Sequence, residues 1–160
     1  KPNEIIAWVL DRPRHEKLIA ELRGTGCGVV LIGDGDVAGV IATTNPDTTI
    51  GVYMGQGGAP EGVLACAALR CVGGQFKGRL VFRNEDERAR ARRWGIEDLD
   101  KQYDLTELAK GDCIFAATGV TDGSLLEGVK RLKGKMTTES VVMRASSGTV
   151  RWIKGEHRTA

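Results

Sequence analysis

Aromatic residues, histidine and an excess of charge of one sign are all scarce in this chain of 160 residues. Aromatic side chains make up 5% of it, and 23 lysines and arginines against 21 aspartates and glutamates leave a formal net charge of +2. A near-neutral chain has no bulk electrostatic attraction for nucleic acid or an anionic membrane, so we expect neither as a partner. No apolar run approaches the ~20 residues that span a bilayer. The hydrophobic share of 41% excludes a disordered tail.

Cysteine is present, but not in the spacing that binds zinc. Cys27, Cys66, Cys71 and Cys113 form no CxxC pair, and the chain has 2 histidines, which argues against a zinc site. We expect reduced and buried thiols in a cytoplasmic protein. Because the chain starts at Lys1 without methionine or a signal peptide, we expect a fragment that begins at or just before a strand.

Glycine is abundant, since 22 of 160 residues is about twice the usual ~7%. Strands are predicted at residues 5–10, 29–32, 49–54, 76–82 and 113–117, with a closing hairpin at 140–144 and 149–153. Helices are predicted up to residue 24, at 37–44, up to 72, at 84–93 and at 105–110. This alternation predicts a single α/β domain over residues 1–160, with a mostly parallel sheet covered by helices on both faces.

Loops rich in glycine and charged residues follow four of the predicted strands, at 11–15, 33–39, 55–62 and 118–123. In open α/β sheets, ligands bind outside the carboxyl ends of the strands. We therefore expect the four loops to meet at one edge of the sheet. Asp122, in the last loop, is a further candidate for this site.

The first loop places two arginines around a proline, as Arg12, Pro13 and Arg14. Arginine forks pair with phosphate oxygens, and a helix N-terminus, where proline is favoured, attracts anions. The pattern fits a phosphate clamp, or equally two exposed arginines that only solvate the turn.

The second loop contains Asp34, Gly35 and Asp36 after an apolar strand. It fits the nucleophile motif of haloacid-dehalogenase phosphatases, although Ala38 stands where threonine or valine is usual. A dinucleotide loop is a weak alternative, because two carboxylates would repel a pyrophosphate. A clamp for sugar hydroxyls and a plain turn also stay open.

The third loop has four glycines within residues 55–62, which lets backbone approach a ligand closely. Pro60 suits the first position of a helix, and Glu61 then lies in the first turn. A carboxylate there can bind Mn²⁺ or Mg²⁺, which prefer oxygen ligands, or it can simply pair with the helix dipole. One glutamate cannot make a metal site alone.

Taken together, the segments IIAWVLDRPRH, LIGDGDVAG, MGQGGAPEGVLACAALRCVGG, DLTELAKGD, ATGVTDGSLLEGV and VVMRASSGTVRWI make the chain resemble class II fructose-1,6-bisphosphatases of the GlpX type. The similarity extends over nearly all 160 residues and corresponds to the C-terminal half of such enzymes. It implies the second half of the lithium-sensitive sugar phosphatase fold, a cytoplasmic location and a homo-oligomer.

The resemblance also implies roles for individual residues. Substrate is expected to contact Arg12, Pro13, Arg14, Asp34, Gly35, Asp36 and Gly58. The arginines would hold the phosphate that is not cleaved, and Glu61 would be the one metal ligand of this half. The other metal ligands, and the threonine associated with attack on phosphate, would belong to an N-terminal half, so no catalytic residue is expected here.

The implied activity is hydrolysis of the 1-phosphate of fructose 1,6-bisphosphate to fructose 6-phosphate and phosphate, with Mn²⁺ or Mg²⁺, in gluconeogenesis and glycerol metabolism. Sedoheptulose 1,7-bisphosphate is an implied second substrate. We expect the isolated chain to be inactive, because one carboxylate cannot retain a metal cluster. Two alternatives stay open: a haloacid-dehalogenase-like phosphatase with Asp34 as nucleophile and Asp36 as acid/base, or a non-catalytic module that binds sugar phosphates.

Overall fold

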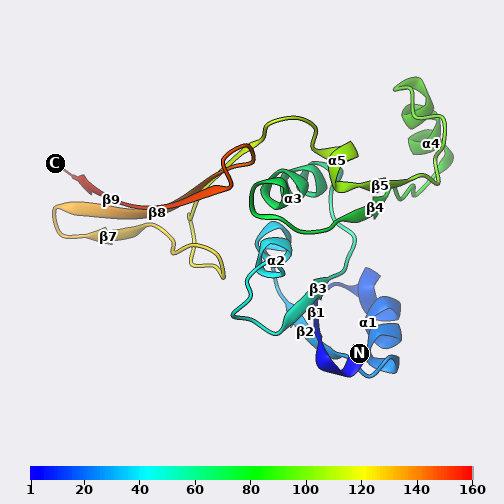
Figure 1. Cartoon of the computed structure of the whole chain (residues 1–160), viewed down its shortest axis with the longest axis horizontal. Coiled ribbons are helices and arrows are strands. Elements are labelled where there is room, and N and C mark those ends of the chain that lie inside the picture. Colours follow the sequence, from blue (N-terminus) through cyan, green and yellow to red (C-terminus); the bar gives the residue numbers. More distant parts are fainter. Residues whose placement is uncertain (160) are drawn as a thin grey trace.

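A computed structural model describes residues 1–159 and contains three separate sheets. The first sheet is parallel, with the strand order β2-β1-β3, and two helices connect its strands (Figure 1). Its elements are β1 (Ile6–Leu10), α1 (Glu16–Gly24), β2 (Gly28–Ile32), α2 (Asp36–Ala42) and β3 (Ile50–Tyr53). Short 3₁₀ turns at Pro2–Glu4 (η1) and Pro13–His15 (η2) come before β1 and α1.

The order of the parallel strands places α1 and α2 on opposite faces of the sheet (Figure 1). The chain moves from the central strand β1 to β2 in one direction and from β2 to β3 in the other, and both crossovers are expected to be right-handed. Within the central strand, Ala7 and Val9 are fully buried. The apolar run at 29–32, whose composition is typical of a buried strand, is not buried, because β2 is an edge strand that leaves Val30 40% and Leu31 39% exposed.

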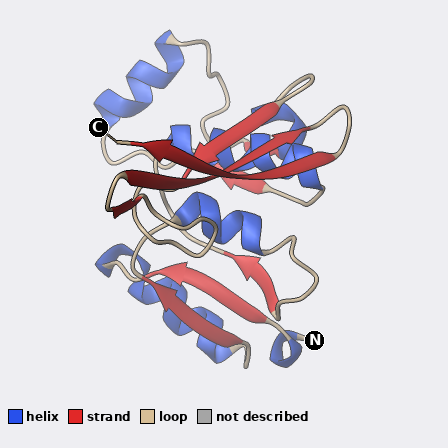
Figure 2. Ribbon diagram, turned by 90° about the vertical axis from the view of Figure 1, so that its left-hand side faces the viewer, coloured by secondary structure: helices blue, strands red, loops and turns tan. Residues whose placement is uncertain are grey.

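Helix α3 (Ala59–Val72) lies at the centre of the molecule. Proline near its start and a run of small apolar residues suit a buried helix, and Ala65, Cys66 and Leu69 are almost completely buried. It packs on α2 at one side. At the other side it packs on a sheet formed by strands between residues 114 and 158, which we call the second sheet. Figure 2 shows the parallel sheet and the second sheet with a helix between them, and further helices behind the second sheet.

The predicted α/β fold with a parallel sheet and helices is confirmed for β1–β3, but the second sheet is antiparallel, so the prediction of one mostly parallel sheet is wrong. The predicted strand at 113–117 forms, but it pairs with β8 rather than with β1–β3. No helix connects these strands within the described residues, and parallel pairing needs a long crossover. The strands are β6 (Ile114–Thr118), β7 (Lys130–Leu132), β8 (Lys135–Arg144) and β9 (Thr149–Arg158), where β8 and β9 extend the predicted hairpin.

The remaining elements project from α3 at the end of the molecule opposite to the β8–β9 hairpin (Figure 1). The predicted strand at 76–82 is reduced to three residues and pairs with a second short strand. The predicted helix at 84–93 forms, because Asn84 Oδ1 accepts a hydrogen bond from Glu87 N at 2.9 Å. These elements are β4 (Lys77–Arg79), α4 (Glu85–Arg93), β5 (Gln102–Asp104) and α5 (Leu105–Leu108).

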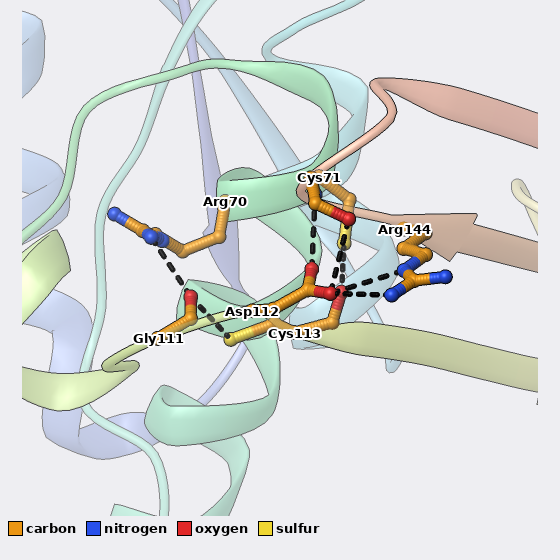
Figure 3. Close-up of polar contacts among 7 residues, drawn as sticks. Arg70, Cys71, Gly111, Asp112, Cys113 and Arg144 are labelled. Atoms are coloured by element: carbon orange, nitrogen blue, oxygen red, sulfur yellow. Dashed lines mark hydrogen bonds and ion pairs between the residues drawn. The ribbon is translucent and has the colours of Figure 1, made fainter.

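The Asp112 carboxylate forms hydrogen bonds that join the loop before β6 to the end of β8 and the turn between β8 and β9 (Figure 3). One of its oxygens accepts hydrogen bonds from Arg144 Nε at 3.0 Å and Arg144 Nη2 at 2.8 Å, and Ser146 donates from both its backbone and its hydroxyl. On the other side of this loop, Arg70 of α3 donates to the carbonyl of Gly111 at 2.9 Å. The second sheet is thereby held to the central helix.

All four cysteines are free thiols, as expected. Cys27, Cys66 and Cys71 are buried, whereas Cys113 is only half-buried. Burial raises the pKa of Cys66 to about 11, so this thiol stays protonated at neutral pH. Among residues 1–159, no helix is long and apolar enough to cross a membrane.

Candidate functional site

The candidate site lies at the carboxyl ends of the three parallel strands. From β1 the chain continues to β2 on one side, and from β2 it crosses over β1 to β3 on the other side. The carboxyl ends of β1 and β3 therefore form a topological switch point, which is where such sheets bind ligands. The loops at 11–15 and 55–62 follow these two strands, and the loop at 33–39 follows β2. The prediction that all four loops meet is wrong for 118–123, which follows a strand of the antiparallel sheet.

Arg12 joins the first loop to the second. Its Nη1 donates to the carbonyl of Asp11 at 2.7 Å, and its Nη2 donates to the carbonyl of Gly33, also at 2.7 Å. Its backbone is extended where it precedes the 3₁₀ turn that starts at Pro13, as the residue before a proline usually is. The guanidinium therefore holds the ends of β1 and β2 together.

Arg14 joins the first loop to the third. Its Nε and Nη2 both donate to the carbonyl of Gln56, at 3.0 and 2.8 Å. The side chain is exposed, so an incoming anion can reach its fork and compete with this single carbonyl. The two arginines of the motif thus serve different neighbouring loops.

Gly35 allows the second loop to turn sharply into α2. Its φ of 84° is in the left-handed region that favours glycine, and it is the N-cap of the helix. Asp34 accepts from the next backbone amide at 2.7 Å and stays exposed. Asp36 reaches the third loop instead, because its Oδ2 lies 2.9 Å from the point where a Cβ on Gly57 would be.

Gly58 and Glu61 begin α3 and lie against each other. Gly58 is the N-cap residue, and a Cβ added to it would overlap Glu61 Oε2. The Glu61 side chain therefore folds back over the start of the helix, and only a residue without a Cβ leaves room for this arrangement. Because the carboxylate is exposed and supplies hard oxygen ligands, it fits a Mn²⁺ or Mg²⁺ ion as one ligand.

The described residues do not form a complete metal site by themselves. Among residues 1–159, no group of three or more histidine, cysteine, aspartate or glutamate side chains could hold a metal ion. That Glu61 supplies one ligand to a metal ion stays a prediction, and the described residues supply no cluster that would complete such a site.

Tyr53 is a site residue that the sequence interpretation missed. Burial and the nearby Asp36 carboxylate raise its pKa to about 12, while the Arg14 guanidinium acts in the opposite direction. Its hydroxyl is consequently a protonated hydrogen-bond donor at neutral pH. A signal was present, since Tyr53 is the last residue of β3 and comes just before the glycine-rich loop.

His15 is the second missed residue. It is 2% exposed, and its ring contacts both the end of β1 and the third loop. Its position next to Arg14 in the RPRH segment was the available signal.

The third loop is the common partner of the predicted residues. Arg14 donates to the Gln56 carbonyl of this loop, Asp36 lies against Gly57, and Glu61 folds over Gly58.

Asp122 is not part of this group. It accepts hydrogen bonds from Gly128 N at 2.9 Å and from Lys130, which lowers the pKa of Asp122, so this candidate fastens the loop after β6.

The fold and the site define an α/β protein that presents an arginine fork and a carboxylate at the switch point of a parallel sheet. A sequence model of the family described as bacterial fructose-1,6-bisphosphatase, glpX-encoded, matches residues 1–157. The chain belongs to this family, and the resemblance inferred from its motifs is confirmed.

Known relatives agree with this assignment. The chain is 42% identical, over 168 aligned residues, to the D-fructose 1,6-bisphosphatase class 2/sedoheptulose 1,7-bisphosphatase of Synechococcus elongatus, covering 97% of this chain and 49% of that protein. It is 41% identical to the protein of the same name from Crocosphaera subtropica, covering 96% and 48%. The chain thus spans about half the length of the curated relatives it matches.

Proposed function

We propose that this chain is the substrate-binding part of a class II fructose-1,6-bisphosphatase. Together with the remaining part, it hydrolyses the 1-phosphate of fructose 1,6-bisphosphate to fructose 6-phosphate and phosphate. The observation that carries the proposal is that Arg14, Asp36 and Glu61 all lie against one loop, residues 55–58, in a chain of the GlpX family. The names of the relatives support sedoheptulose 1,7-bisphosphate as a second substrate.

In this proposal the arginine motif holds the phosphate that is not cleaved, with a different role for each arginine. Arg14 exchanges the carbonyl of Gln56 for two phosphate oxygens, while Arg12 keeps the neighbouring loop in place. Anchoring this distant phosphate converts binding energy into orientation of the reacting end. Asp34 and Asp36 would accept hydrogen bonds from sugar hydroxyls, as ionised carboxylates do, and Tyr53 would donate one.

Glu61 would hold one divalent ion at the other end of the substrate. A Mn²⁺ or Mg²⁺ ion bound there would supply positive charge to the phosphoryl oxygens and a means of activating water. This chain contributes an exposed carboxylate at a helix N-terminus, and the remaining ligands would come from the part of the enzyme that precedes it. The complete enzyme would be a cytoplasmic homo-oligomer.

Phosphate release tests this division of labour. Purified chain is incubated with fructose 1,6-bisphosphate and Mn²⁺, alone and after addition of the N-terminal half of a class II relative. We expect no turnover from the chain alone and turnover from the mixture. Robust release by the isolated chain would contradict the proposal.

The same assay separates the two alternative interpretations. A haloacid-dehalogenase mechanism requires a covalent phosphate on Asp34, so Asp34→Asn would abolish turnover and also prevent a beryllofluoride adduct. A non-catalytic module would bind the bisphosphate in a calorimeter without Mn²⁺, would need Arg14 to do so, and would stay inactive in the mixture.

A further inference from the structure

His15 is buried beneath the loop that the site residues share. Its Nδ1 lies 2.8 Å from the carbonyl oxygen of Leu10, and its Nε2 accepts a hydrogen bond from Gln56 N at 2.9 Å. A Cβ added to Gly55 would lie 3.3 Å from His15 Cε1, so the ring also packs against the start of the loop. The imidazole therefore connects the last residue of β1 to the loop after β3.

The partners of His15 determine the state of its ring. A backbone carbonyl can only accept a hydrogen bond, so the proton must be on Nδ1. A backbone amide can only donate, so Nε2 must be unprotonated. Both contacts can form together only in the neutral imidazole with its proton on Nδ1.

Gln56 is consequently held from two sides. His15 accepts from its amide nitrogen, and Arg14 donates twice to its carbonyl oxygen. When a phosphate takes over the fork of Arg14, the carbonyl loses this partner while the bond to His15 can remain. The loop then still connects the phosphate-binding end of the site to Glu61 at the start of α3.

We propose that His15 is a positioning residue for substrate binding. As a neutral Nδ1–H imidazole, it keeps the Gln56 backbone in place, so that Arg14 is already oriented before the phosphate arrives and the loop keeps its shape afterwards. This inference rests on the proposed function for the identity of the ligand, but the state of the ring and the restraint on Gln56 can be measured without any substrate.

The first test measures directly which nitrogen of the His15 ring carries the proton. In the 160-residue chain with ¹⁵N-labelled histidine, long-range ¹H–¹⁵N spectra at neutral pH should show a protonated Nδ1 and an unprotonated Nε2 for His15. His157, which is exposed on β9, serves as the internal comparison. The opposite tautomer or a charged ring would overturn the proposal.

The second test removes one contact at a time. His15→Asn keeps an amide donor close to the Leu10 carbonyl but leaves Gln56 N without an acceptor, whereas His15→Gln places an amide oxygen near the former Nε2. In the chain alone, hydrogen exchange of the Gln56 amide should accelerate about tenfold or more in His15→Asn and less in His15→Gln. Equal exchange in the wild type and His15→Asn would overturn the restraint.

The third test asks whether this restraint serves binding. In the mixture of the two halves, His15→Asn should raise the KM for fructose 1,6-bisphosphate about tenfold, His15→Gln should raise it less, and both should change kcat little. A purely structural histidine would instead give equal KM values in the two variants, with equal losses of thermal stability. If the wild-type mixture hydrolyses no bisphosphate, the proposed function fails, and the ring state and Gln56 exchange still decide whether His15 positions the loop.

Discussion

Arg14 illustrates how a single side chain can be held in place and still be available to a ligand. Its fork is occupied by one carbonyl oxygen of Gln56, which is a neutral partner, and the side chain is exposed. A phosphate offers charged oxygens that form stronger hydrogen bonds with the same fork. The contact with Gln56 therefore orients the guanidinium without excluding an anion.

The first prediction concerns the loss of this fork. Arg14→Ala should raise the KM for fructose 1,6-bisphosphate in the mixture of the two halves by about 10- to 150-fold, since charged hydrogen bonds contribute about 1.5–3 kcal/mol. Arg14→Lys should recover part of the loss, because a lysine supplies charge but no fork. Steady-state kinetics measure the effect, with Arg23→Ala at the end of α1 as the control. Unchanged KM in Arg14→Ala would refute a phosphate contact.

The second prediction concerns the space beside Glu61. Gly58→Ala should leave the fold intact, because the φ of −71° at this position suits alanine, but the new Cβ must push the Glu61 carboxylate away. Half-saturation of turnover by Mn²⁺ should then need about tenfold more metal, a loss typical of disturbed ligand placement. Gly62→Ala is the control, because a Cβ there meets only Phe76 Cζ at 4.0 Å. Equal Mn²⁺ requirements in the two variants would argue against Glu61 as a ligand.

Among the secondary structure elements, the loop before β6 is joined to the β8–β9 turn by hydrogen bonds to one carboxylate, that of Asp112. Asp112 accepts from Arg144 and Ser146, and these hydrogen bonds lower the pKa of Asp112, with the side-chain bond from Arg144 as the largest cause. A carboxyl whose pKa is lower in the folded than in the unfolded state stabilises the fold at neutral pH. That stabilisation is lost as the pH falls through its folded value.

The third prediction follows from this linkage. Asp112→Asn should lower the midpoint of urea unfolding at neutral pH, and the difference from the wild type should shrink as the pH falls below the ordinary pKa of an aspartate, about 3.9. Unfolding followed by circular dichroism at several pH values measures it. Asp47→Asn, in the exposed loop before β3, is the control. A difference that stays constant into strong acid would contradict the assignment.

For the whole molecule, the apolar face of the antiparallel sheet extends further than α3 covers. Trp152 and Val150 of β9 lie directly opposite Val141 and Met143 of β8, so they project from the same face of the sheet. The two residues on β8 are buried, whereas Trp152 is 55% and Val150 37% exposed. Because the relatives are about twice as long as this chain, we expect their remaining part to cover this face.

The fourth prediction tests this surface. Trp152→Glu should weaken association of the chain with the N-terminal half of a class II relative by about tenfold or more, because a buried aromatic side chain contributes about 2 kcal/mol or more to an interface. Isothermal titration calorimetry measures the affinity. Trp94→Glu is a matched control, since Trp94 is 74% exposed at the end of α4 on the opposite end of the molecule. Equal affinities of the two variants would rule out the face around Trp152.

Local patterns are sufficient to predict the elements and part of the site. Apolar runs and helix caps place the strands of the parallel sheet and the helix at 84–93 within one or two residues, because caps and side-chain periodicity act over a few neighbouring residues. Residue type and spacing likewise identify the motif at 12–14 as a potential anion fork and Glu61 as a potential metal ligand. The family follows from the order of such segments and is confirmed by the comparisons.

Strand pairing and side-chain contacts between distant segments could not be predicted in this way. The run at 113–117 has the composition of a buried strand in either kind of sheet, and its antiparallel partner β8 comes much later in the chain. The positions of His15 and Tyr53 beside known motifs are only a weak signal, because their contacts with the third loop exist only where β1 and β3 lie side by side. Composition and short spacing establish which elements form, whereas long-range pairing decides which side chains meet, because contact energies depend on proximity in space.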